Sequence, residues 1–361
     1  MSALARFLRE EVDKGSFPGG VALAGTTERI LEAAAAGDAA VEPEEDPISE
    51  DTRFDLASLT KPLASGALTA AAISSGLDLA SPPGRFLPDW KQTRFDGITL
   101  ASLLTHTSGL RAWYPLYVRG EGAEAYRRTL ATLEPEQRPG AAVIYSDLNF
   151  VLLGDILETF FSAPLATLFD EMVAAPAKSR ASYAPGAARQ TAATEKGDAT
   201  ERAMTAERGL DYPRFRTGVV RGEVHDGNAL RRGGVSGHAG LFGTARDVWH
   251  LARRWLLDPP PGFLDDRTPD LPEARGLAWQ LSRGAGSAVP QFSSSAFGHT
   301  GFTGTSLWVD PERDLVLILL TNRIHPEIRE KDFHPVRRRF HEAALAAHGG
   351  LTRESSRPQL L

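Results

Sequence analysis

The distribution of strand-forming and helix-forming segments along the chain places the strongest constraint on its fold. Short apolar runs typical of β-strands occupy residues 20–25 and 29–36 near the start, and three more lie within residues 295–322. Between about residues 77 and 290 the pattern is one of helices and loops, with few β-branched runs. Because an isolated pair of strands is only marginally stable in water, we expect the two groups of strands to form one antiparallel sheet.

Helical patterns accompany both groups of strands. Residues 3–14 and residues 332–348 alternate apolar and charged positions at helical spacing, and the apolar, small-residue segment 54–76 predicts a buried helix. The fold class we expect is therefore α+β: an antiparallel sheet flanked by helices, with an inserted, mainly helical domain. The expected domains are a discontinuous α/β-sheet domain, residues 1–76 and 290–361, and a helical insert, residues 77–289.

The composition of the 361 residues narrows the possible functions. A formal net charge of −6 disfavours a nucleic-acid partner, whose binding surface would be basic. The absence of cysteine excludes disulfides, thiolate metal sites and a cysteine nucleophile. Charged residues interrupt the N-terminal segment, and no apolar run approaches the roughly 18 residues of a membrane span. From these features we expect a cytoplasmic protein with no membrane partner.

Ser58 and Lys61 form a Ser-x-x-Lys motif at the start of the predicted helix. Residues three apart lie on one face of a helix, so the Ser58 hydroxyl and the Lys61 amine are expected side by side. A serine hydroxyl is a weak nucleophile, and a desolvated lysine can be neutral enough to activate it. Because the chain contains only six lysines, a lysine at this spacing is less expected by chance.

Two further motifs follow in a fixed order. Tyr-Ser-Asp at 145–147 lies in an apolar run, and His-Thr-Gly at 299–301 lies on a predicted strand. This order resembles the penicillin-recognising serine hydrolases, and most closely the class C β-lactamase-related group, which includes D-alanyl-D-alanine carboxypeptidases and esterases. The phrases LLTHTSGL at 103–110 and GGVSGHAGLFGTARDVW at 233–249 extend the resemblance over most of the chain. The resemblance implies a β-lactamase/transpeptidase-like fold.

The resemblance also implies catalytic roles. Ser58 would be the acylated nucleophile, and Lys61 would shuttle or withdraw its proton. Tyr145 would be a second proton carrier, acting as a base toward Ser58. A phenol with an ordinary pKa of about 10 needs a nearby positive charge to act as a phenolate, and Lys61 would supply that charge.

A second group of residues would bind the substrate. His299 would flank it, and Thr300 would donate a hydrogen bond to a substrate carboxylate. The backbone N–H groups of Ser58 and Phe302 would form the oxyanion hole. Gly301 would let the strand approach the substrate closely, because any side chain there would intervene.

Two positions depart from the pattern of the resembled family. Many members have lysine where His299 stands, and an ordinary imidazole is mostly neutral at pH 7. Asp147 replaces the asparagine usual in β-lactamases of this type, and an ionised aspartate can only accept hydrogen bonds. Asp147 would also hold Lys61 cationic, which favours Tyr145 as the operating base. Both departures disfavour efficient β-lactam hydrolysis.

Several of these residues also have a purely structural interpretation. The alternative interpretation of Tyr145 is a core tyrosine, and that of Asp147 is a helix N-cap. His106 is expected to be structural, at a helix end, and residues 337–339, three consecutive arginines, are expected on a solvated helix face. Three further polar residues are expected in loops, where either a structural place or a place in the cleft is open: Asp226, Asn228 and His238.

The sequence therefore predicts a serine hydrolase that acts through a Ser58 acyl-enzyme on a small-molecule ester or a small amide or peptide, a cytoplasmic esterase-like enzyme. One alternative is a β-lactamase or a D-alanyl-D-alanine carboxypeptidase, and another is a non-catalytic, penicillin-binding type of sensor module. No cofactor is expected, and no His-Glu-x-x-His motif or tight cluster predicts a metal. No heptad pattern predicts an oligomer, which leaves the oligomeric state open.

Overall fold

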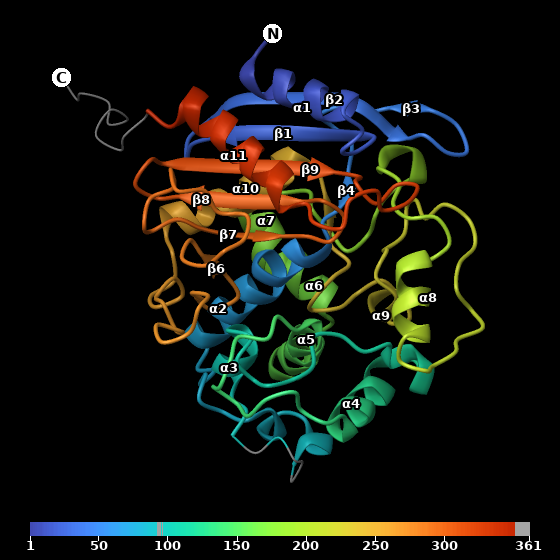
Figure 1. Cartoon of the computed structure of the whole chain (residues 1–361). Coiled ribbons are helices and arrows are strands. Elements are labelled where there is room, and N and C mark those ends of the chain that lie inside the picture. The colour runs from blue at the N-terminus through green and yellow to red at the C-terminus, as the bar shows by residue number, and fades with distance from the viewer. Residues whose placement is uncertain (92–94, 96, 351–361) are drawn as a thin grey trace, which may run out of the picture.

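The computed structural model describes residues 1–91, 95 and 97–350 and shows one large antiparallel sheet with helices on both faces (Figure 1). The strand order is β3-β2-β1-β9-β8-β7-β6. The strands are β1 (Gly19–Gly25), β2 (Ile30–Ala40), β3 (Asp46–Pro47), β6 (Gln280–Leu281), β7 (Phe297–Thr300), β8 (Ser306–Asp310) and β9 (Leu315–Thr321). The N-terminal β1 pairs antiparallel with the C-terminal β9, from Gly20 opposite Thr321 to Gly25 opposite Val316. The expected single sheet built from both ends of the chain is thus confirmed.

The helices fall into α-helices and shorter 3-10 or π segments. The α-helices are α1 (Ala3–Asp13), α2 (Ala67–Ser74), α3 (Leu100–Leu104), α4 (Gly122–Thr132), α5 (Asp147–Phe161), α6 (Leu165–Phe169), α7 (Ala175–Ala177), α8 (Ala199–Ala206), α9 (Gly227–Leu230), α10 (Ala245–Leu257) and α11 (His334–His348). The other segments are η1 (Ala57–Leu59), η2 (Lys61–Gly66), η3 (Pro83–Arg85), η4 (Pro88–Trp90), η5 (Leu116–Arg119), η6 (Asp170–Ala174) and η7 (Ala188–Gln190).

Helices bury both faces of the sheet. On one face, α1 and α11 share an apolar cluster with Leu317 and Leu319 of β9. On the other face, Ile318 and Leu320 of the same strand belong to the larger cluster that includes α10 and the helical part of the molecule. Because successive side chains of a strand point to opposite faces, the continuous apolar sequence of β9 suits a strand covered on both sides. Figure 1 shows α1 and α11 in front of the sheet and α10 behind it.

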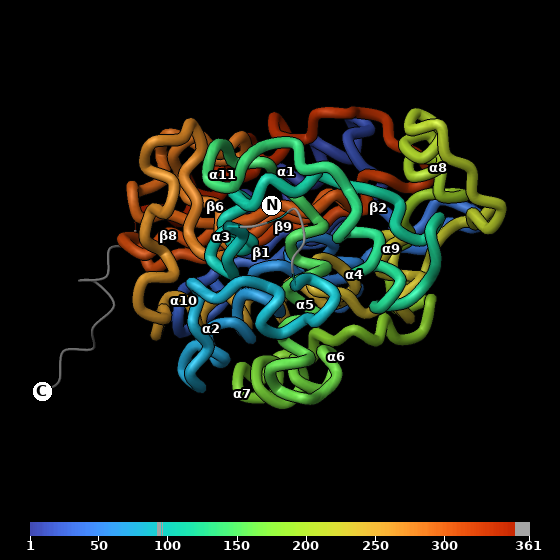
Figure 2. Tube along the Cα trace, turned by 90° about the horizontal axis from the view of Figure 1, so that it is seen from below, coloured from blue at the N-terminus to red at the C-terminus, as the bar shows by residue number. Residues whose placement is uncertain are grey.

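Helix α5 forms the centre of the helical part (Figure 2). Ten consecutive residues, Leu148 to Leu157, are buried. Gly154 allows a close backbone contact, since a Cβ there would lie 3.0 Å from the backbone nitrogen of Gly237. Among the residues that the structure describes, no single helix is long and apolar enough to cross a membrane; only α5 taken together with Leu165–Ala177, at a bend of 78°, meets both criteria.

The segment around the Ser-x-x-Lys motif differs in detail from the single helix expected over 54–76. It begins as strand β4 (Phe54–Asp55), which pairs with β5 (Phe242–Gly243), and then continues as η1, η2 and α2. The short β4–β5 sheet ties the start of this segment to the helical part. Strand β6 and helix α10 lie within the expected insert but join or cover the main sheet. The domain boundaries therefore stay a prediction.

Candidate active site

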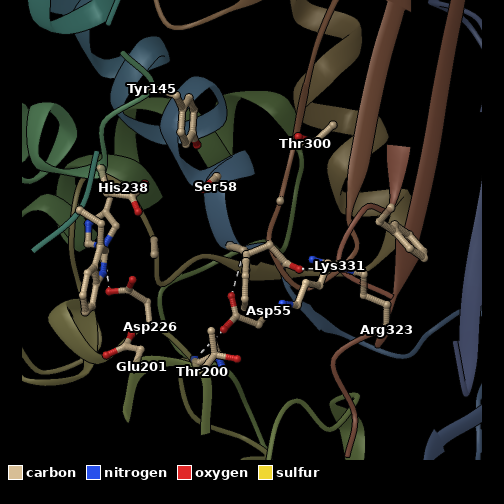
Figure 3. Close-up of a pocket in the computed structure, with 18 of the residues that line it drawn as sticks. Asp55, Ser58, Tyr145, Thr200, Glu201, Asp226, His238, Thr300, Arg323 and Lys331 are labelled. Carbon is tan, nitrogen blue, oxygen red and sulfur yellow. Dashed lines mark hydrogen bonds and ion pairs between the residues drawn. The ribbon is translucent and has the colours of Figure 1, made fainter. Parts of the chain in front are cut away.

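A cleft of about 340 Å³ opens between the edge of the main sheet at β7 and the helical part (Figure 3). Such a volume lies within the range of small-molecule sites. It is lined by residues from all three sequence motifs: Ser58, Tyr145, Asp147, Thr300, Gly301 and Phe302. The fold thus brings together side chains that are up to about 240 positions apart in the sequence.

A tight turn presents Ser58 at the cleft. Strand β4 ends at Asp55, and one oxygen of its carboxylate accepts the backbone N–H of Ala57 at 2.9 Å. Ala57 has φ +48°, in the left-handed region, where a non-glycine residue costs roughly 1–2 kcal/mol. The Asp55 hydrogen bond offsets part of that cost and fixes the turn from which η1 starts.

Lys61 is fully buried and lies between two partners. Its Nζ donates to the Ser58 Oγ at 2.7 Å and forms an ion pair with Oδ1 of Asp147, also at 2.7 Å. Burial lowers the pKa of Lys61, but the charges of Asp147 and Tyr145 outweigh burial, and the net pKa is raised above its ordinary value. Lys61 is therefore an ammonium at neutral pH, the charge state expected with an aspartate at position 147.

Tyr145 lies beside this ion pair. Its ring centroid is 4.8 Å from the Lys61 Nζ and 4.5 Å from the ring centroid of His106. Burial raises the pKa of Tyr145, the Lys61 charge lowers it and the Asp147 charge raises it, with a net rise above 10. The resting form at neutral pH is therefore the phenol, and the phenolate is a minor form that Lys61 stabilises.

The ring of His106 packs against the ring of Tyr145. His106 directly follows the last turn of α3 with φ +60°, and its Nδ1 accepts the backbone N–H of Ser146 at 3.0 Å. Burial and the charge of Arg275 lower the pKa of His106 well below its ordinary value, so the ring is neutral. His106 is therefore a buried residue at a helix end, as expected, and its ring contacts that of Tyr145.

The structure places His299 beside Tyr145 rather than on the cleft surface. His299 is 2% exposed, and the two ring centroids are 5.8 Å apart. Its Nδ1 donates to the carbonyl oxygen of Thr300 at 2.8 Å. Burial and the Lys61 charge lower the pKa of His299 well below 6.5. His299 is therefore a neutral, buried neighbour of Tyr145, while Thr300 itself lines the cleft.

The structure requires a glycine at position 301 for a reason other than the expected close approach to the substrate. A Cβ at this position would lie 2.0 Å from the Thr305 Oγ1 and 2.8 Å from the carbonyl oxygen of Leu56. Glycine is therefore required by the backbone that precedes Ser58, not by the substrate alone. This packing holds Gly301 against the turn that precedes Ser58. The oxyanion hole and the substrate-binding role of Gly301 and Phe302 stay predictions.

Both the sequence and the fold of this chain are similar to those of known proteins. The sequence matches the Beta-lactamase family over residues 4–338. This chain belongs to that family. An N-acetylmuramyl-L-alanine amidase of Bacillus subtilis strain 168 is 30% identical over 318 residues, which are 79% of this chain and 71% of the amidase. A Salmonella agona SL483 protein provisionally named D-alanyl-D-alanine carboxypeptidase is 30% identical over 322 residues, covering 79% of this chain and 72% of that protein.

Solved structures show the same fold. A penicillin-binding protein homologue from Caulobacter crescentus superimposes with a TM-score of 0.73 at 18% identity, covering 96% of each chain. The expected β-lactamase/transpeptidase-like architecture and the resemblance to this group of hydrolases are confirmed. The chain is a hydrolase of the serine β-lactamase family, and the roles of its individual residues stay predictions.

In this member of the Beta-lactamase family, the cleft also contains charged residues that sequence patterns did not indicate. Its further lining includes four carboxylates and three cations: Asp55, Glu201, Asp226, Asp332, Arg323, Lys331 and Arg337. Of the loop residues left open, Asp226 and His238 line the cleft. Asn228 instead accepts the backbone N–H of Leu116 at 2.9 Å and has a structural place.

The expectation of a solvated face was wrong for Arg337. It is 5% exposed, and its Nη2 donates to the carbonyl oxygen of Gly301 at 2.7 Å. Phe333 and His341 lie four residues to either side of it and are buried too. That spacing is the signal for the inner face of α11, and three consecutive arginines obscured it. Within the described ranges, no group of three or more metal-ligating side chains is arranged to hold a metal ion.

Proposed function

We propose that this chain hydrolyses small ester or amide substrates through an acyl-enzyme on Ser58, with an esterase-like preference. The observation that carries the proposal is the hydrogen bond from the buried Lys61 ammonium to the Ser58 hydroxyl at 2.7 Å, with Tyr145 lining the same cleft. A nucleophile, a fixed cation and a titratable phenol at one cleft suit acyl transfer.

Acylation would proceed as follows. The phenolate form of Tyr145 takes the Ser58 proton while Ser58 Oγ attacks the substrate carbonyl carbon. The carbonyl oxygen becomes an oxyanion that the N–H groups of Ser58 and Phe302 stabilise. The bond to the leaving group then breaks, and the leaving alcohol or amine receives the proton from Tyr145.

Deacylation reverses these roles. Tyr145 takes a proton from water, the resulting hydroxide attacks the acyl carbon, and Ser58 leaves and recovers the proton. Lys61 keeps its own proton throughout, since the ion pair with Asp147 holds it cationic. Lys61 therefore acts by stabilising negative charge on Ser58 and Tyr145.

The preference for esters and simple amides over β-lactams rests on two residues. His299 is neutral and buried, so the position where many family members have lysine offers no positive charge next to Thr300 for the fixed carboxylate of a β-lactam. Asp147 presents a carboxylate where a β-lactam acylamide would gain from a donor. The amidase and carboxypeptidase names of the two relatives support amide bonds as a substrate class.

Hydrolysis of phenyl acetate and of nitrocefin by the purified protein tests the proposal. Ser58→Ala should abolish phenyl acetate turnover. Ser74→Ala, at the exposed end of α2, is the matched control and should retain it. Equal turnover by Ser58→Ala would overturn the acyl-enzyme proposal. Faster turnover of nitrocefin than of phenyl acetate would instead favour the β-lactamase alternative.

A further inference from the structure

Carboxylates and basic groups are concentrated on different sides of the cleft, with Asp332 on the basic side and His225 and His238 on the acidic side. Figure 3 shows the carboxylates of Glu201 and Asp226 on one side of Ser58 and the cationic groups of Arg323 and Lys331 on the other. In this view Ser58 lies between these two groups. A ligand that bridges the cleft would therefore meet opposite charges at its two ends.

On the cationic side of the cleft, Arg337 has a buried hydrogen-bond donor that is not used. One of its nitrogens bonds to Gly301, but the buried Nε has no hydrogen-bond partner among the described residues. Arg323 is the second guanidinium here, and its Nε donates to the carbonyl oxygen of Phe302 at 3.0 Å. Burial and the Arg323 charge lower the pKa of Arg337 to about 9.

Among the residues that the structure describes, no carboxylate forms an ion pair with Arg337 or Arg323, whose hydrogen bonds go to backbone carbonyls. Asp332, the acidic residue on this side of the cleft, accepts the backbone N–H of His334 at 2.9 Å. Its charge raises the pKa of Arg337 but does not offset burial and Arg323. A buried donor without a partner costs about 1–3 kcal/mol, and a bound anion would remove that cost.

The acidic side is held by backbone, hydroxyl and histidine donors. Glu201 is 7% exposed, and its carboxylate accepts the Gly227 N–H at 2.6 Å and the Tyr117 hydroxyl at 2.8 Å. Asp226 accepts the Ala229 N–H at 2.7 Å. Its other contact is with His238, 2.8 Å from the same oxygen. Burial and the Asp226 charge raise the pKa of Glu201 to about 7. Two carboxylates that repel each other in one wall would both gain from a bound cation.

We propose that the substrate of this cleft is zwitterionic: a free carboxylate pairs with Arg337 and Arg323, and a free ammonium group pairs with Glu201 and Asp226. This inference rests on the proposed function, because it assigns the substrate of the same nucleophile. The chemical class is a dipeptide, or an ester analogue of similar length that keeps a free ammonium and a free carboxylate, whose scissile carbonyl lies between its two charges. The apolar residues Trp113 and Phe333 line the same cleft and would contact its side chains.

Protection of Ser58 from a fluorophosphonate tests the proposal without requiring turnover. The probes are Gly-Gly, L-Ala-L-Ala and D-Ala-D-Ala, each with both ends free, with the amine acetylated, with the carboxylate amidated, or with both ends blocked. Ser58 labelling is followed by intact-protein mass spectrometry. At least one free dipeptide should protect about 10- to 100-fold better than its singly blocked forms, as expected for the loss of one charged hydrogen bond.

Variants assign each charge to its side of the cleft. Glu201→Gln should remove the advantage of the free amine and keep that of the free carboxylate, and Arg337→Met should do the reverse. A general structural disturbance would reduce both advantages together. Glu207→Gln and Arg329→Met are matched controls, because both residues are exposed and neither lines the cleft. They should retain both advantages.

Three outcomes would overturn the inference. If Ser58 is labelled but all four forms of every dipeptide protect equally, or none protects, the zwitterionic class is wrong and the proposed function stands. If Glu201→Gln and Arg337→Met leave the two advantages unchanged, these residues do not recognise the charges. If the fluorophosphonate does not label Ser58 at all, the proposed function fails first, and the inference with it.

Discussion

Replacing Asp147 by asparagine would change the charge state of the whole candidate site. Asp147 lies 2.7 Å from the Lys61 Nζ, and its charge raises the pKa of Lys61 and of Tyr145. Asp147→Asn removes that charge with little change in shape. The pKa of Tyr145 should therefore fall, and its phenolate should form at lower pH.

The size of the shift follows from the geometry. Two unit charges about 4 Å apart interact by about 4 kcal/mol at an effective dielectric constant of about 20, which corresponds to about three pKa units. Lys61 is fully buried, but the Asp147 side chain is 22% exposed, so water screens part of the interaction. We therefore expect the pKa values of Lys61 and Tyr145 to fall by about one to two units each.

The rate of Ser58 labelling by a fluorophosphonate, measured from about pH 6 to about pH 10, reports the active base directly. In the wild type the rate should still be rising at the upper limit, because the pKa of Tyr145 is above its ordinary value. In Asp147→Asn the rising limb should move about one to two units toward acid. Asp147→Glu keeps the charge and should resemble the wild type, and Asp170→Asn, an exposed residue, controls for the substitution itself.

A profile for Asp147→Asn that superimposes on that of the wild type would refute this reasoning. So would a shift of the rising limb toward alkaline pH. Circular dichroism of the variant excludes unfolding as the cause, since removing one partner of a buried ion pair can cost about 3–5 kcal/mol.

Two further predictions concern single side chains. Tyr145→Phe keeps the ring against His106 but removes the hydroxyl, so kcat/KM for phenyl acetate should fall about 10²- to 10⁴-fold with little change in Tm; a fall of less than about five-fold would exclude Tyr145 as the base. His341 is fully buried, and burial lowers its pKa to about 3. The unfolded chain binds this proton near pH 6.5 and the folded chain does not, so stability should fall by about 1.4 kcal/mol per pH unit below pH 6.5. Urea denaturation at about pH 7 and pH 5 should show a smaller loss for His341→Gln, and an equal loss would contradict this assignment.

The parts of the fold and site that the sequence predicted are those set by local spacing. Ser58 and Lys61 are three residues apart, and the predicted contact is the 2.7 Å hydrogen bond observed. The apolar runs that became β1 and β9 are long and distinct, so their pairing in one sheet was predictable. Tyr145 and Asp147 were found because they form one short motif.

The remaining features depend on long-range packing that has no local signal. Arg337 enters the cleft only because the inner face of α11 packs against the backbone of Gly301. Glu201 is fixed by the distant Tyr117, and nothing near position 201 indicates that contact. The family resemblance implied that His299 would flank the substrate. The His299 side chain instead packs beside Tyr145, and the carbonyl of its neighbour Thr300 holds its orientation.

The central claim is that Ser58 carries the acyl group during turnover. The most direct test is rapid acid quenching of the protein during phenyl acetate hydrolysis, followed by intact mass measurement and peptide mapping. The account predicts an acetyl adduct on the peptide that contains Ser58, and no adduct in Ser58→Ala. An adduct on another residue, or steady hydrolysis by Ser58→Ala without any adduct, would contradict it.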